Sequence, residues 1–495
     1  MQTRVFQAAT IVFCVILILA AQFSIPTIFG ADGYLHIRMA QFTRDDGVIR
    51  NFHWARYSTF AENFADKDFL YHLMLIPFTF FPSIFFGAKV AAVLFALFLF
   101  LVFAYMLRRY CTAQALIPFF LLMFLCSSHF LQAINRPRNM VFIIALSLLF
   151  VHFLIQKRQL PLCLIAVVYA LSHVSSPFLF VIALAAETVR FIYNRQFFWK
   201  SLRAVAFGIL LGFLIHPNFP NNILVFYLNG MLVPLYSFKW GLELGAEFFP
   251  VDTRSLVLGY PFVWVGLFLL IALGMSKGNK VGIATRIWMC VAGFFFALSL
   301  FSQRYIIHSY PMILVSGASY ISDWWGSEVR LGAIRQNRNL RNISLGVAVA
   351  IFFFTGFYVY RDFLGDASRI KEYNQHYEHA AGWISRYVPK GETVFHANWS
   401  DSQYFIGLAP QYDYFVTLDP IYMYYWNPRK YNLYRDIAFG RAKDPYVLLK
   451  DEFASWYGYV GKNYFDRLIQ QIRADQRFKI LAEDRLGLVF RLMPS

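Results

Sequence analysis

Three acidic side chains in the segment 30–83 are the first residues whose type and spacing suggest chemistry. Asp32 comes just past the end of a long apolar run, and Asp66 and Asp68 stand two residues apart farther along. A carboxylate at a membrane surface can accept a proton from a nucleophile or ligate a hard divalent cation. The spacing therefore predicts a metal site at Asp32, Asp66 and Asp68, with a solvated loop that merely carries acids as the alternative.

Arginine and histidine residues at the ends of other apolar runs form a second candidate group. Such side chains at one level of a membrane protein suit the oxygens of a phosphate. Arg304 is the strongest candidate, because it lies in a short apolar connection where an unpaired charge is costly. The remaining members of this predicted phosphate-binding group are Arg136, Arg138, His173, His216 and His308. For each single histidine, contact with lipid headgroups or a hydrogen bond between helices is the alternative.

Two further segments contain residues suited to recognising an acceptor. Trp399 and Asp401 directly follow a predicted strand, where an indole ring gives contact area and polar neighbours give direction. Glu243, Glu247 and Asp252 lie in a segment rich in proline, asparagine and aromatic residues, 217–255, and one of them could complete a metal site or gate a substrate. The alternatives are a structural turn around Trp399 and a flexible solvated loop.

The composition is typical of a membrane protein, so helices within a membrane are expected to position these residues. The chain is 58% hydrophobic and only 15% charged, whereas soluble domains are about 25% charged. Apolar runs long enough to cross a bilayer recur through the first 360 residues, and they predict about eleven transmembrane helices. The predicted spans are 5–29, 84–107, 113–128, 140–156, 160–173, 177–193, 203–216, 256–275, 283–301, 306–325 and 343–360.

The distribution of lysine and arginine predicts the orientation. The net charge of +17 comes mainly from basic clusters in alternate loops, on the same side as Arg4. The positive-inside rule puts that side in the cytoplasm, so the C-terminal part lies outside. We expect a multi-pass protein of a bacterial inner membrane, although an archaeal membrane would give the same pattern. A nucleic-acid partner is not expected, because the part outside the membrane is nearly neutral.

The predicted organisation is a polytopic α-helical membrane domain followed by an α/β domain outside the membrane. Residues 1–360 form the first, with long outer loops at 30–83 and 217–255. In the first loop, 34–42 and 69–81 suit helices that lie at the membrane surface. Residues 361–495 alternate between strands and helices. The predicted strands are 392–398, 414–418, 457–460, 478–481 and 487–492.

Several short motifs resemble those of the GT-C membrane glycosyltransferases, and in particular the catalytic subunits of oligosaccharyltransferases. Residues 32–38, DGYLHIR, are similar to the first-loop signature of that family, which implies that Asp32 is a catalytic residue contacting metal and acceptor. Residues 302–305, SQRY, are similar to the place of a phosphate-contacting arginine, which implies that role for Arg304. The family reads its acceptor peptide with a Trp-Trp-Asp motif, and WSD at 399–401 occupies that place.

This resemblance implies an inverting glycosyltransferase that takes its sugar from a polyprenyl-phosphate or polyprenyl-pyrophosphate carrier. The acceptor is a protein, lipid or glycan at the outer face, as in protein glycosylation or the building of a cell envelope. Asp32 would orient or deprotonate the acceptor, Asp66 and Asp68 would hold Mg²⁺ or Mn²⁺, and the arginines would neutralise the leaving phosphate. A transporter or flippase of lipid-linked sugars and a polysaccharide polymerase or ligase are the alternative functions.

Overall fold

In a computed structural model of the chain, the described residues fall into two compact units. The description covers residues 2–239, 242–261, 264, 281–327, 338–462 and 464–494. The first unit, called the helical unit below, comprises Met1–Ile25, Ala92–Gly212 and Ala246–Ser368. The second, called the mixed unit, comprises Pro26–Ala91, Phe213–Gly245 and Arg369–Ser495. The predicted outer loop 30–83 and most of 217–255 thus belong to the same unit as the predicted α/β domain.

The helical unit is built from the apolar runs of the sequence. A helix forms at each predicted span that the structure describes, and only most of span 256–275 lies outside the described residues. Apolar segments in a bilayer satisfy their backbone groups internally by becoming helical. The helices are α1 (Gln2–Gln22), α4 (Ile84–Tyr110), α5 (Ile117–Phe124), α6 (Ser128–Asn135), α7 (Met140–Ile155), α8 (Gln159–Ala170), α9 (Phe178–Asn194), α10 (Trp199–Leu214), α13 (Thr253–Gly259), α15 (Ile283–Ser299), α16 (Ile306–Ser327) and the first part of α18 (Arg338–Tyr387).

The predicted count of eleven spans is not confirmed. Among the described residues, two helices are long and apolar enough to cross a bilayer alone, Arg4–Gln22 and Ile84–Tyr110. The pair α5 and α6 passes the same test only when joined, and it is bent by 77°. The bend falls at Ser127, whose hydroxyl caps α6 by accepting a hydrogen bond from the backbone N–H of Phe130. Other apolar helices, such as α8, are shorter than the about 20 residues that a span needs.

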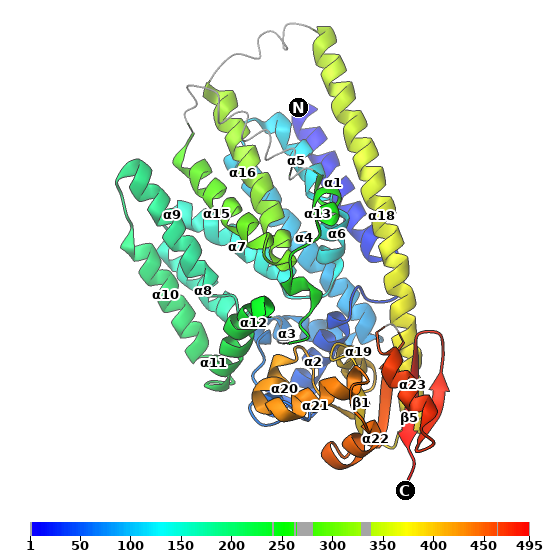
Figure 1. The fold of residues 1–495 in the computed structure, drawn as a ribbon. Coiled ribbons are helices and arrows are strands. Elements are labelled where there is room, and N and C mark those ends of the chain that lie inside the picture. Colours follow the sequence, from blue (N-terminus) through cyan, green and yellow to red (C-terminus); the bar gives the residue numbers. More distant parts are fainter. Residues whose placement is uncertain are drawn as a thin grey trace. The chain divides into compact units, whose positions relative to one another are not determined.

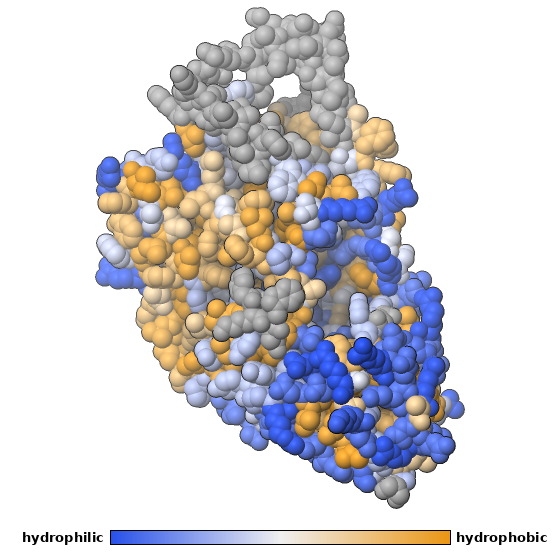
Figure 2. Space-filling model, in the orientation of Figure 1, coloured by the Kyte–Doolittle hydropathy of each residue, from blue (hydrophilic) through white to orange (hydrophobic). Residues whose placement is uncertain are grey.

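Small residues let α8 and α10 approach closely within the helical unit. A Cβ added to Gly208 would lie 2.5 Å from the carbonyl oxygen of Cys163, and one added to Gly212 would lie 2.6 Å from the Cβ of Ala170. This small-xxx-small spacing is typical of helices packed together in membranes. On the surface of this unit, hydrophobic side chains cover the face over α9 and α10 (Figure 2).

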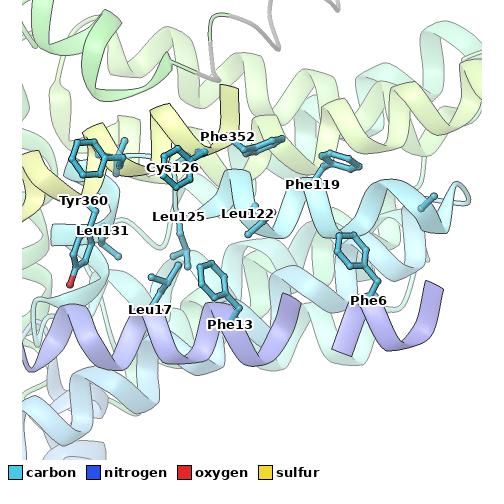
Figure 3. Close-up of a pocket in the computed structure, with 15 residues that line it drawn as sticks. Phe6, Phe13, Leu17, Phe119, Leu122, Leu125, Cys126, Leu131, Phe352 and Tyr360 are labelled. Atoms are coloured by element: carbon cyan, nitrogen blue, oxygen red, sulfur yellow. The ribbon is translucent and has the colours of Figure 1, made fainter. Parts of the chain in front are cut away.

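An apolar groove of about 810 Å³ opens between α1, α5, α6 and α18 in the helical unit. Figure 3 shows Phe6, Phe13 and Leu17 of α1 on one side and Phe352 and Tyr360 of α18 on the other. Residues of α5, including Phe119 and Leu122, form the wall between them. Among the residues that line the groove, only Cys126 and Tyr360 have side chains that are not pure hydrocarbon.

Helix α18 is a single helix of 50 residues, Arg338–Tyr387 (Figure 1). At about 1.5 Å per residue it is roughly 75 Å long, more than twice the ~30 Å hydrocarbon core of a bilayer. The sequence pattern predicts a span at 343–360 and a separate helix at 373–387. The structure joins them, because the intervening residues contain neither proline nor a capping signal strong enough to end a helix.

The mixed unit contains a five-stranded sheet with the order β2-β1-β3-β5-β4. The three strands β2, β1 and β3 are parallel, and β5 and β4 are antiparallel to their neighbours. All five predicted strands are confirmed, with ends that differ by a few residues. They are β1 (Thr393–His396), β2 (Asp413–Tyr414), β3 (Tyr457–Gly461), β4 (Phe478–Glu483) and β5 (Gly487–Leu492).

Helices accompany this sheet and give the mixed unit a hydrophilic surface. They are α19 (Asp401–Leu408), α20 (Ile421–Trp426), α21 (Pro428–Ala438), α22 (Pro445–Val447) and α23 (Asp466–Ala474). Hydrophilic side chains cover the surface over α21, α22 and α23 (Figure 2). The amphipathic α23 shows why: Leu468, Ile469 and Ile472 are buried on one side, and charged side chains occupy the other.

The segment 26–91 folds onto the sheet of the mixed unit. Ala55 forms a parallel bridge with Tyr414, and the backbone N–H groups of Arg56 and Tyr57 donate to Tyr414 and Phe415 at 2.8 and 2.9 Å. Both predicted segments are helical, as α2 (Asp32–Asp46) and α3 (Phe69–Leu75), the latter continued by a 3-10 turn, Ile76–Phe80, and their place at a membrane surface stays a prediction. These hydrogen bonds satisfy the edge of β2.

Candidate functional site

Asp32 is the first residue of α2, where the helix dipole favours a negative charge. Its helix is held in place by two side chains. The guanidinium of Arg38 donates to the carbonyl of Gly407 from Nε at 2.9 Å and Nη2 at 2.7 Å, and the hydroxyl of Tyr34 donates to Glu378 at 3.3 Å. Gly407 has no side chain to keep α19 away from Tyr34, so the residues of the DGYLHIR motif anchor the helix that begins with Asp32.

Asp66 lies in a buried network of histidines in the mixed unit. Its Oδ2 is 2.6 Å from Nδ1 of His72, and Nε2 of His72 is 2.8 Å from Nδ1 of His36. All three side chains are at most 7% exposed. His216 donates from Nε2 to the backbone carbonyl of Asp66 at 3.0 Å. The backbone N–H of Asp66 donates to Oδ1 of Asn218 at 3.3 Å. The segments 30–83 and 217–255 therefore meet at Asp66.

The arrangement of Asp66 and Asp68 does not fit a divalent cation. Oδ1 of Asp66 accepts the N–H of Asp68, its Oδ2 faces His72, and Oδ2 of Asp68 is paired with the ammonium of Lys67 at 2.7 Å. A metal ion would have to displace Lys67, which already supplies a positive charge. In the part of the chain that the structure describes, no three His, Cys, Asp or Glu side chains are placed to hold one ion. Metal use therefore stays a prediction.

Four of the six predicted phosphate-binding residues come together in the helical unit with Glu247. Nη1 of Arg138 lies 3.3 Å from Oε2 of Glu247, and Nη1 of Arg304 lies 3.6 Å from Oε1. Nη2 of Arg304 is 3.4 Å from Nε2 of His173. Arg136, two residues before Arg138, is close enough to act on the charge of Glu247. We call Arg136, Arg138, Arg304 and His173 the arginine cluster.

Short turns hold the arginine cluster together. Glu247 lies in the 3-10 turn Ala246–Phe248 and Arg304 in the turn Gln303–Tyr305. The hydroxyl of Ser302 donates to the carbonyl of Glu247 at 2.7 Å, and the N–H of Gln303 donates to the carbonyl of Phe249 at 3.0 Å. Desolvation raises the pKa of Glu247, but Arg138 and Arg304 outweigh it and bring the pKa down to about 2. The carboxylate is therefore ionised and occupies a site suited to an anion.

Two of the predicted acceptor-binding residues touch in the mixed unit, and a third is buried. The indole of Trp399 donates to the backbone carbonyl of Glu243 at 2.7 Å, which joins the start of α19 to the end of segment 213–245. Asp401 is 1% exposed and accepts the hydroxyl of Tyr377 at 2.6 Å, and burial raises its pKa to about 7. Asp401 is therefore packed inside the mixed unit, and its contact with an acceptor stays a prediction.

Three predicted site residues lie beside other partners than the sequence suggested. Glu247, expected at an acceptor, lies in the arginine cluster, because its turn packs on that of Arg304. His216, expected at a phosphate, instead donates to Asp66 in the mixed unit. His308, also expected at a phosphate, is buried in α16, where its ring stacks on Phe295 at 5.3 Å and its Nε2 lies 2.9 Å from the sulfur of Met140. A histidine inside an apolar helix turns toward neighbouring helices, and the sequence does not show which way.

Sequence reasoning missed His72 and Lys67 and gave His36 no role of its own. His36 stands within the DGYLHIR motif, four residues after Asp32, so the helical period could have placed it on the same face. His72 follows Asp66 by six residues, a spacing that matches no known motif. Only the turn between Asp66 and α3 brings the two together.

The fold resembles those of solved membrane transferases, although no protein-family model and no curated protein matches the sequence. The apo oligosaccharyltransferase of Archaeoglobus fulgidus matches with a TM-score of 0.67 at 11% identity, over 92% of this chain and 69% of that one. ArnT of Cupriavidus metallidurans bound to undecaprenyl phosphate matches with a TM-score of 0.56 at 14% identity, over 97% of each chain. The archaeal oligosaccharyltransferase AglB in complex with an inhibitory peptide and a dolichol-phosphate matches with a TM-score of 0.60 at 11% identity, over 92% of this chain and 69% of that one.

These likenesses show the fold, which is that of GT-C glycosyltransferases such as these. The fold expected from the sequence motifs is therefore confirmed over nearly the whole chain. The activity of the chain is a separate question, which its own residues must answer.

Proposed function

We propose that this protein is a membrane glycosyltransferase that moves a sugar from a polyprenyl-phosphate or polyprenyl-pyrophosphate carrier to an acceptor at the outer face of the membrane. The observation that carries the proposal is the arginine cluster, in which Arg138 and Arg304 hold the ionised carboxylate of Glu247. Guanidinium groups that bind a carboxylate also suit the oxygens of a phosphate. The cluster belongs to a unit of apolar helices, where a phosphate attached to a lipid is the anion to expect.

The apolar groove of the helical unit supports a lipid-linked donor. It is lined by hydrocarbon side chains of α1, α5 and α18 (Figure 3). Isoprenoid chains fit such surfaces, because an apolar chain and an apolar wall pack through van der Waals contacts. Among proteins of this fold, the ArnT structure contains undecaprenyl phosphate and the AglB structure dolichol-phosphate. A donor of the same chemical class is the substrate that this groove and the arginine cluster suit together.

In the proposed reaction Asp32 orients the acceptor, and the arginine cluster stabilises the leaving group. The oxygen or nitrogen of the acceptor attacks the anomeric carbon of the sugar while the bond from that carbon to the phosphate oxygen breaks. One such displacement inverts the configuration at the carbon. Arg304, Arg138 and Arg136 neutralise the charge that develops on the phosphate, an effect strongest where water is excluded. No step in this scheme passes through a metal ion.

The decisive experiment is mass spectrometry of lipid-linked sugars in membranes of a deletion strain that carries either the wild type or Asp32→Asn. Asparagine keeps the size of the side chain and removes its charge, so the variant should fold but lose at least about 100-fold in turnover. We expect a sugar-bearing polyprenyl lipid to build up in the variant strain, and its mass identifies the donor.

Asp45→Asn is the matched control. Asp45 is an aspartate of the same helix, but it is exposed and paired with its neighbour Arg44. This variant should keep the wild-type lipid pool. If neither deletion of the gene nor Asp32→Asn changes the pool of any lipid-linked sugar, the proposed function is wrong.

A further inference from the structure

The buried chain Asp66–His72–His36 has a defined direction of hydrogen bonding. An ionised carboxylate only accepts hydrogen bonds, so Nδ1 of His72 carries the proton that faces Asp66. Nε2 of His72 then lacks a proton and accepts from Nδ1 of His36, at 2.8 Å. It follows that Nε2 of His36 lacks a proton as well. Asp66 thus fixes the tautomer of a ring two links away, as carboxylates do for histidines in active sites.

His36 lies one helical turn after Asp32 on the same face of α2. The charged and titratable groups that act on its ring are His72, Asp68, Asp32 and Lys67. Burial, followed by the neighbouring His72, lowers the pKa of His36 to about 3. The ring is therefore neutral near pH 7, and its Nε2 carries a lone pair.

A small cavity of about 20 Å³ adjoins this ring. His36, His72, Asp66 and Asp68 contribute to its wall, and apolar residues such as Leu35 and Met39 complete it. The surface of the cavity is mostly apolar, and its volume has room for about one water molecule. A proton acceptor that reaches its substrate through one water is still within working distance.

We infer that His36 accepts the proton released by the attacking group of the acceptor, and that His72 and Asp66 are positioning residues that hold its ring and take up the charge. This inference rests on the proposed function, because it assigns the proton of the same transfer step. Asp32 orients the acceptor, and His36, one turn away, receives the proton through the water-sized cavity. In this proton transfer along His36, His72 and Asp66, the carboxylate of Asp66 has a role that does not involve a metal ion.

Protons and electrons balance in this step without another reactant. The acceptor loses a proton to Nε2 of His36 as it bonds to the anomeric carbon. The proton on Nδ1 of His36 moves to Nε2 of His72, and the proton on Nδ1 of His72 moves to Oδ2 of Asp66. The leaving phosphate keeps the electron pair of the broken carbon–oxygen bond. After release of product, Asp66 returns its proton along the same chain, and the tautomers are restored.

Two substitutions of His36 separate proton transfer from a structural role. His36→Asn places an amide N–H close to where Nδ1 stands, so it keeps the hydrogen bond to His72 but has nothing at the position of Nε2. His36→Gln places its amide oxygen near the position of Nε2, where it accepts a hydrogen bond but no proton at neutral pH. A structural residue would tolerate the first change, and a residue that only orients the acceptor would tolerate the second.

The test uses full-length protein in membranes and in detergent. For each variant we would measure the lipid-linked sugar pool of the deletion strain, the temperature of unfolding, and the affinity for undecaprenyl phosphate as the probe. We expect both variants to unfold close to the wild-type temperature and to bind the probe within about twofold of wild type. We also expect both to lose about 100-fold in turnover, the usual effect of removing a general base. Asp66→Asn should lose turnover in the same way, because an amide cannot accept the proton from His72.

Each other outcome has a definite meaning. Wild-type turnover in His36→Asn or in His36→Gln overturns the inference while leaving the proposed function intact. Weaker probe binding together with a lower unfolding temperature in His36→Asn makes the histidine chain structural and overturns it too. If the wild type consumes no lipid-linked sugar, the proposed function itself fails, and that result is visible before any His36 variant is compared.

Discussion

At the scale of single residues, the charge of Glu247 is the most informative feature of the helical unit. Its carboxylate is one-third exposed, yet it is bound by Arg138 and Arg304, and its pKa is lowered to about 2. It therefore remains an anion at every physiological pH. In the proposed transferase, this carboxylate occupies the place that a phosphate needs. A donor has to displace Glu247 from the arginines before it binds there.

Replacing Glu247 by glutamine should therefore strengthen the binding of a lipid phosphate. The substitution removes the competing charge and keeps the size of the side chain. Hydrogen bonds to a charged partner contribute about 1.5–3 kcal/mol, so we expect affinity for undecaprenyl phosphate to rise by roughly tenfold. Native mass spectrometry or calorimetry of the purified protein measures this change.

Glu243→Gln is the control for that measurement. It removes the same charge from the same predicted loop, but the bonds that Glu243 forms with Trp399 and Tyr431 use its backbone. Its affinity for the probe should match that of the wild type. A weaker affinity in Glu247→Gln would instead mean that the carboxylate holds the arginines in their binding geometry.

At the scale of elements, the contact between α2 and α19 decides where Asp32 stands. A Cβ on Gly407 would lie 2.7 Å from the Cβ of Tyr34 and 2.9 Å from its carbonyl group. Arg38 on the same helix also binds the carbonyl of Gly407. The position of the candidate acidic residue thus depends on one glycine in a helix more than 370 residues later in the chain.

Gly407→Ala should destabilise the protein by about 1–3 kcal/mol, because the added methyl group overpacks this contact. It should also reduce turnover, since α2 must shift. Gly382→Ala is a matched control in the exposed part of α18, where an added Cβ meets nothing within 4 Å. There the same change should stabilise by about 0.5–1 kcal/mol through helix propensity. Thermal unfolding in detergent compares the two, and equal shifts of the same sign would contradict the packing argument.

At the scale of the whole molecule, positive charge is supplied by the chain itself. The net charge is +17, Lys67 neutralises Asp68, and arginines surround the anion site in the helical unit. Of the three acidic residues that were expected to bind a metal, Asp66 and Asp68 already have protein partners. The proposed transfer therefore needs no resident divalent cation to offset the charge of the leaving group.

Removing divalent cations should accordingly leave turnover within about twofold of its starting value. The measurement is the consumption of the lipid-linked sugar by wild-type membranes before and after treatment with EDTA. A parallel sample with restored Mg²⁺ or Mn²⁺ controls for unspecific effects of the chelator on membranes. Loss of turnover that either metal restores would show that Asp66 and Asp68 rearrange around an ion, as the acidic spacing first suggested.

The sequence alone determined the elements of this protein. Apolar runs became helices, because a bilayer or a core leaves the backbone no other partner, and alternating residues in 361–495 became the five strands. The motif around Asp32 and the arginine at 304 pointed to the fold that the solved structures confirm. These features depend on residues close together in the chain, and local periodicity and spacing report them directly.

Only the tertiary structure decided which side chains meet. Glu247 joined the arginines, His216 turned to Asp66, and His308 was buried, although the sequence suggested an acceptor for the first and a phosphate for the other two. Asp66, His72 and His36 became a chain through a turn whose geometry no motif encodes. Hydrogen bonds and ion pairs between distant segments depend on packing to within about an ångström, and one sequence does not contain that information in any local pattern.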